Sequence, residues 1–86
     1  MYKMYKHTHK LLSLLLGGKM TKGTVKWFNS QKGYGFIMPE TGGKDVFVHI
    51  TKLEEIGLKK LNEGQQVSYE LYDDRGRIAA GNIKLM

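Results

Sequence analysis

The segment from 26 to 37, KWFNSQKGYGFI, constrains the fold more than any other part of the sequence. Residues 24–29 are β-branched and aromatic, which predicts a strand. A turn is predicted over 30–33 and a second strand over 34–38, which Pro39 ends because proline cannot donate to a strand ladder. The segment therefore indicates a β-rich fold built from short strands.

The same segment interleaves aromatic and cationic side chains. Soluble domains normally bury their aromatic residues or scatter them singly over the surface. Rings beside lysines suit a surface on which unpaired bases stack while cations meet phosphates. A lone ring on a strand is more often part of the core, so the binding hypothesis requires several rings on one exposed face. The side chains concerned are Lys26, Trp27, Phe28, Lys32, Tyr34 and Phe36.

The rest of the chain continues with strand-like runs separated by turn signals. A glycine-rich connection is predicted over 40–44. Five short strands with one long connection between the third and fourth suit a small closed antiparallel barrel, because closure removes the exposed sheet edges. The three remaining predicted strands cover 45–50, 66–72 and 77–85, with a turn over 73–76 before the last.

The long connection between the third and fourth strands carries a helix signal. Thr51 to Glu54, TKLE, matches a capping box, so we expect about one helical turn there. Leu53, Ile56 and Leu61 are the apolar residues expected to supply core contacts from this connection.

Alternation in the third predicted strand, DVFVHI, separates two faces. The valines and Ile50 fall on one side, which is the natural core face. Antiparallel pairing with the second strand is expected to bring four flat side chains onto the opposite surface. These four are Tyr34, Phe36, Phe47 and His49.

The motifs KGYGFI and VFVHI, with KGTVKWFNSQ, LNEGQQVSYEL and the AAGNI ending, resemble the bacterial cold-shock proteins over 20–86. The resemblance implies a single cold-shock domain, an all-β five-stranded antiparallel Greek-key barrel with the oligonucleotide-binding (OB) fold. It also implies a monomeric cytoplasmic protein that binds single-stranded RNA and DNA. Such a protein acts as an RNA chaperone or transcription antiterminator in a cold-shock-type stress response.

Carried over by position, the resemblance assigns base stacking to five residues and supporting contacts to five more. The stacking residues are Trp27, Tyr34, Phe36, Phe47 and His49, flanked by Phe28, and the polar or phosphate contacts come from Lys26, Asn29, Lys32 and Arg75. Three positions depart from the family pattern. Ile50 and Leu58 stand where many relatives have an aromatic residue, which predicts a shorter or looser footprint. Arg77 replaces a frequent proline, which predicts an added cation near the site.

Charge and residue types restrict the alternatives. The net charge is +6, but 20–86 carries ten lysines and arginines against eight acids, a balance of only +2. Binding is therefore expected to depend more on stacking than on phosphate neutralisation. There is no cysteine, and no phosphate-binding loop, nucleophile–base pair or metal cluster is visible, so we expect no enzyme, cofactor or metal. Two alternatives stay open: a small nuclease using His49, and a sequence-selective DNA-binding transcriptional regulator.

The first nineteen residues differ from the rest of the chain. They contain four lysines, no acid and an apolar run of six residues interrupted by a serine. This run is too short for a signal-peptide core of about 7–15 residues or a membrane-spanning helix of about 20. We expect 1–19 to be a disordered extension, with Met20 as an alternative start, which mass spectrometry of the native N-terminus would decide. His7 and His9 are weak evidence for a metal site.

Overall fold

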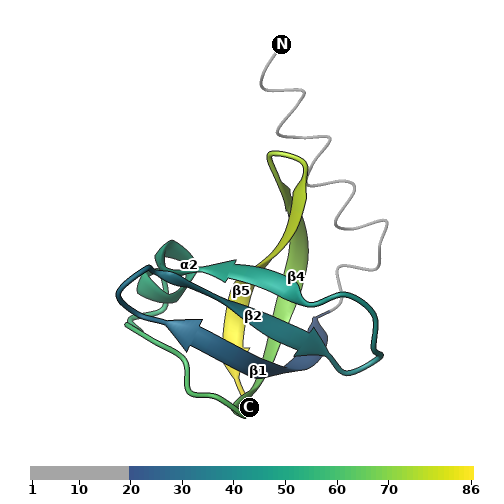
Figure 1. Ribbon diagram of the computed structural model, residues 1–86, viewed down its shortest axis with the longest axis horizontal. Helices are drawn as coiled ribbons and strands as arrows, with labels where there is room; N and C mark the ends of the chain where they lie inside the picture. Colours follow the sequence, from purple (N-terminus) through teal and green to yellow (C-terminus); the bar gives the residue numbers. More distant parts are fainter. Residues whose placement is uncertain (1–19) are drawn as a thin grey trace.

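A closed five-stranded barrel is the architecture of the computed structural model, which describes residues 20–86 (Figure 1). The elements are β1 (Thr21–Asn29), β2 (Tyr34–Pro39), β3 (Val46–His49), α2 (Ile50–Glu54), β4 (Gln66–Asp74) and β5 (Arg77–Leu85). Around the barrel the strands follow the order β1-β2-β3-β5-β4. This confirms the predicted all-β barrel with an OB fold. The expectations for 1–19 lie outside the described residues.

Barrel closure differs from the prediction at one seam. Four of the five neighbouring pairs are antiparallel, whereas β3 and β5 are parallel and share a single registered pair, Phe47 with Ala79. Each of the four antiparallel junctions extends over four or more registered pairs. The barrel therefore closes through a short contact between β3 and β5 at Phe47.

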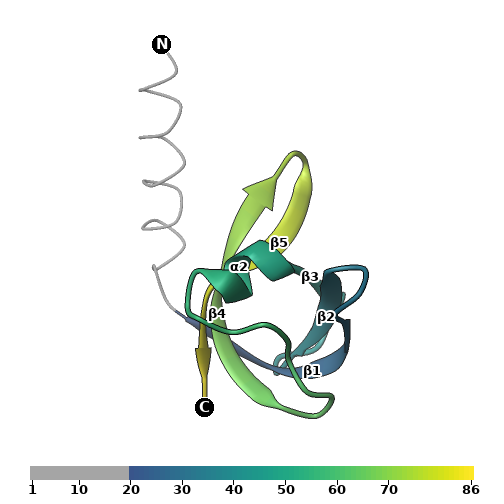
Figure 2. The same cartoon turned by 90° about the vertical axis from the view of Figure 1, so that its left-hand side faces the viewer.

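The strands are longer at several ends than the sequence pattern predicted. β1 begins at Thr21 and β4 continues to Asp74, so the predicted four-residue turn shrinks to Arg75 and Gly76. Both turn residues have positive φ, 57° and 88°, as a type I′ hairpin requires. The β4–β5 hairpin consequently projects beyond the barrel (Figures 1 and 2).

The predicted capping box is wrong, and the third strand is two residues shorter than expected, since neither Asp45 nor Ile50 belongs to β3. His49 is the N-cap of α2: its backbone is extended, and its Nδ1 accepts from the Thr51 backbone N–H at 3.2 Å. Thr51 therefore lies inside the helix. Ile50 starts the helix instead of ending the strand, because the chain turns immediately after His49.

The core lies inside the barrel. Leu53 and Leu61 are buried as predicted, but Ile56 is 42% exposed. The helix has only five residues, and Ile56 follows it in a turn that leads to Gly57 at φ 78°. One helical turn is too short to direct both Leu53 and Ile56 inward. The buried cluster is Val25, Ile37, Val46, Val48, Leu53, Leu61, Val67, Tyr69, Ala80 and Ile83.

A β-bulge in β1 determines where its aromatic residues point. Val25 pairs with Ile37, but Trp27 pairs with Phe36, so Lys26 is an extra residue in the ladder. Strict alternation would place Trp27 on the buried side with Val25. The bulge shifts Trp27 to the outer side and turns Phe28 inward, where it packs against the core.

Tyr69 is fully buried, and its hydroxyl has no hydrogen-bond partner within residues 20–86. A buried hydroxyl without a partner costs about 1–3 kcal/mol. We expect Tyr69→Phe to raise the free energy of unfolding by about 1 kcal/mol, measured by urea denaturation. A loss of stability would contradict this and mean that the hydroxyl has a partner such as a bound water.

The same variant is expected to change the alkaline stability. Burial raises the pKa of Tyr69, so the native state keeps this proton at a pH where the unfolded phenol has lost it. Stability is therefore lost as pH rises above the ordinary tyrosine pKa of about 10. In Tyr69→Phe this alkaline loss should become smaller.

Candidate nucleic-acid interface

Five flat side chains from three neighbouring strands form one surface, here called the ring cluster: Trp27, Tyr34, Phe36, Phe47 and His49. Strands β2 and β3 pair Tyr34 with His49 and Phe36 with Phe47, which confirms the pairing expected from the sequence. Strand β1 adds Trp27 opposite Phe36. Their neighbours on the inner side, including Ile37 and Val48, are fully buried. The ring cluster therefore covers the outer side of β1, β2 and β3.

The rings contact one another across the whole cluster. The Trp27 centroid lies 5.3 Å from that of Phe36 and 5.6 Å from that of Tyr34, both edge-on. Tyr34 and Phe47 are stacked with centroids 5.7 Å apart and planes at 28°. Such distances are typical of favourable aromatic pairs.

No ring of the cluster is fully buried. Trp27 is 36% exposed and the other four side chains are half-buried. Each ring therefore keeps surface that a flat partner can contact. An exposed group of contiguous rings is unusual for a soluble domain unless it binds something.

The predicted polar residues fall into different environments. Lys26 Nζ donates to Asp45 Oδ2 at 2.9 Å, so this cation is already paired. The Asn29 side chain accepts from the Lys32 backbone N–H at 2.9 Å and thereby holds the turn between β1 and β2. Lys32 is exposed in that turn. Arg75 lies in the turn between β4 and β5. This hairpin projects beyond the barrel (Figures 1 and 2).

Two further residues change the predicted site. Phe28 faces Gly35 and packs against the core, so it does not belong to the ring cluster. The Arg77 guanidinium lies 4.6 Å from the Phe47 centroid, which confirms the cation expected from its departure from the family pattern. Leu58 also packs against the core and does not belong to the ring cluster.

His49 is the last residue of β3 and the N-cap of α2. His49 Nδ1 is engaged by Thr51, through its backbone N–H and with Oγ1 at 3.0 Å. Among residues 20–86, no three His, Cys, Asp or Glu side chains group closely enough to hold a metal ion. In the same part of the chain, no helix has the length and apolar character needed to cross a membrane.

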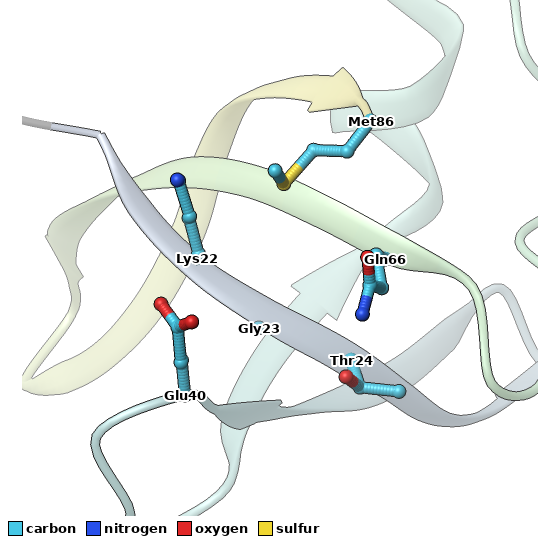
Figure 3. A pocket seen from close by; sticks show the side chains of 6 residues that line it. All are labelled: Lys22, Gly23, Thr24, Glu40, Gln66 and Met86. Carbon is cyan, nitrogen blue, oxygen red and sulfur yellow. The ribbon is translucent and has the colours of Figure 1, made fainter.

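A hollow of about 160 Å³ lies between β1 and β4, away from the ring cluster (Figure 3). It contains no aromatic side chain and therefore provides no stacking face. Its lining residues are Lys22, Gly23, Thr24, Glu40, Gln66 and Met86.

Comparison with known proteins agrees with this geometry. A family model described as the 'Cold-shock' DNA-binding domain matches residues 21–86. The chain is 54% identical over 67 residues to the probable cold shock protein y4cH of Sinorhizobium fredii, covering 76% of this chain and 97% of the relative. It is 55% identical over 67 residues to cold shock protein CspB of Geobacillus stearothermophilus, covering 77% and 100%. It is 49% identical over 67 residues to cold shock protein CspA of Rhizobium meliloti, covering 76% and 97%.

Proposed function

This chain belongs to the cold-shock domain family, which binds nucleic acid, and on that premise we propose that it binds single-stranded RNA and DNA by base stacking. The observation that carries the proposal is the ring cluster, five contacting and accessible rings on one side of the barrel. Each stacked base is worth about 1–3 kcal/mol, so five rings supply a gross stabilisation of about 5–15 kcal/mol. Micromolar affinity requires about 8 kcal/mol after the cost of ordering the strand, which lies within this range.

The proposed binding surface combines the ring cluster with nearby polar groups. Lys32 would meet phosphates from the turn after β1 and Arg77 from the β5 side, whereas Lys26 would have to exchange its ion pair with Asp45 for a phosphate. Asn29 acts mainly by holding the turn that positions Tyr34. Arg75 contributes only if the strand reaches the hairpin tip. Since residues 20–86 carry a balance of only +2, the rings supply most of the affinity.

RNA chaperone or antitermination activity follows from such binding without any chemical step. A protein that binds only the unpaired strand shifts the equilibrium between folded and unpaired RNA by mass action, so no ATP is required. Duplexes bind worse because their bases are already stacked and paired. We propose a non-enzymatic, monomeric, cytoplasmic protein acting in a cold-shock-type response.

Titration with nucleic acid, followed by fluorescence of Trp27, tests the proposal. An eight-residue oligothymidylate is expected to quench the fluorescence with micromolar or tighter affinity, because the only tryptophan lies in the ring cluster. A duplex of the same length should bind at least tenfold more weakly. Equal or tighter duplex binding would contradict the proposal and favour a sequence-selective DNA-binding regulator.

A further inference from the structure

A sixth ring lies on the outer side of the barrel, next to the ring cluster. Strands β3 and β5 pair Phe47 with Ala79, and β5 and β4 pair Ala79 with Tyr72. Residues paired across neighbouring strands project from the same face of a sheet. Neighbouring strands are about 4.8 Å apart, so the backbones of Phe47 and Tyr72 are separated by about 10 Å.

The stretch of β5 between these two rings carries small residues, Ala79 and Gly81. Ala79 is fully buried under its neighbours, so the β5 residue between Phe47 and Tyr72 contributes only a covered methyl group and no long side chain. Beside it, a Cβ built on Gly81 would lie 3.2 Å from the Tyr72 ring, so the glycine lets that ring lie close to β5. The β5 residues between the two rings are therefore small, and the long side chains near the rings are those of Arg77 and Lys52.

A cation stands over each of the two rings. Lys52 Nζ, on α2, lies 4.9 Å from the centroid of the Tyr72 ring. The Arg77 guanidinium lies 4.6 Å from the centroid of the Phe47 ring. Cations over accessible rings are held more weakly than a stacked base. A base can therefore displace either long side chain, which then remains near enough to meet a phosphate.

Acidic groups limit the electrostatic part of this arrangement. Glu55 accepts from Lys52 Nζ at 3.4 Å. Burial raises the pKa of Tyr72, Lys52 lowers it, and Asp74 and Glu55 raise it further, so both carboxylates act at this ring. Both carboxylates repel a phosphate, so this position contributes to binding mainly through the face of the Tyr72 ring.

We propose that Tyr72, with Lys52 above it, is an additional base-stacking position that extends the interface across β5 to β4. Its ligand is one more unpaired nucleotide of the strand that occupies the ring cluster, so the inference rests on the proposed function. Because the position adds stacking and only one partly neutralised cation, it lengthens the footprint with little increase in the salt dependence of binding.

The test compares oligothymidylates of four and eight residues bound to the full chain, with Trp27 fluorescence as the readout. The variant Tyr72→Leu removes the ring and keeps apolar cover over Ala79. We expect it to lower the affinity for the eight-residue strand about fivefold, which corresponds to the lower end of the range for losing one stacked base. The affinity for the four-residue strand should stay unchanged. Tyr72→Phe is the matched control, which keeps the ring and should bind both lengths as the wild type does.

A second pair of variants addresses the cation. Lys52→Gln is expected to lower the eight-residue affinity about twofold, whereas Lys59→Gln, which removes an exposed lysine of the long connection, should not. The proposal is overturned if Tyr72→Leu binds the eight-residue strand normally, or loses the same factor at both lengths. If the wild type binds neither strand, the proposed function itself fails, whereas intact four-residue binding with no effect of Tyr72→Leu rejects only the added position.

Discussion

Replacing Phe47 by alanine is expected to weaken binding of an eight-residue single strand about 30-fold while the barrel stays folded. Phe47 is central to the ring cluster, since its ring contacts those of Tyr34, Phe36 and His49 and also the Arg77 guanidinium. The variant loses one stacking face and the support that holds its neighbours in place. A loss of about 2 kcal/mol, within the range for one stacked base, corresponds to about 30-fold in affinity.

Survival of the fold follows from the position of Phe47 on β3. Its neighbours in the strand, Val46 and Val48, are buried and hold β3 against the core. Trp27 fluorescence would report binding, and circular dichroism would report folding. Ile78→Ala is the control, because this residue is apolar, 55% exposed on β5 and outside the ring cluster, and it should bind normally. Wild-type affinity in Phe47→Ala would reject the stacking surface.

Gly35→Ala is expected to destabilise the barrel by about 3 kcal/mol, the largest effect on stability predicted here. A Cβ built on Gly35 would lie 2.7 Å from Phe28 Cα and closer still to the Trp27 carbonyl oxygen. These are backbone atoms of β1, so relief requires the two strands to separate. Overpacking of this kind costs about 1–3 kcal/mol and occasionally more. The total stability of such a domain is roughly 3–10 kcal/mol.

Thermal unfolding followed by circular dichroism measures this effect. Gly42→Ala is the control: no atom lies within 4 Å of its built Cβ, so only its positive φ of 87° opposes the substitution. That strain costs about 1–2 kcal/mol. Equal stability loss in the two variants would mean that β1 and β2 are less closely packed than the structure shows. Gly35→Ala should also weaken binding, because it displaces Trp27 and Phe28.

Several features could be predicted because they depend on short-range pattern. The alternation in β2 and β3 correctly placed Tyr34, Phe36, Phe47 and His49 on one face, since successive side chains of a strand point to opposite sides. The same reasoning failed at the end of β3. Helix α2 begins at Ile50 because the His49 side chain caps it, and a histidine cap is not among the usual signals.

Other features depended on contacts between distant residues. Arg77 lies over Phe47, and Lys52 lies over Tyr72. Both contacts exist only because β5 closes the barrel between β3 and β4. The sequence pattern assigned Tyr72 to a strand but gave no reason to place it beside the ring cluster.

The residue pattern, with the family resemblance, is enough to identify a small β-barrel with a cluster of rings on β2 and β3. The outward position of Trp27, in contrast, depends on how two strands pair. Alternation in β1 points its ring towards the core beside Val25, and the bulge at Lys26 turns it outward. The extra residue is accommodated by the pairing of β1 with β2, where Gly35 leaves room for Phe28. The register of two strands, and not the local sequence, therefore completes the ring cluster.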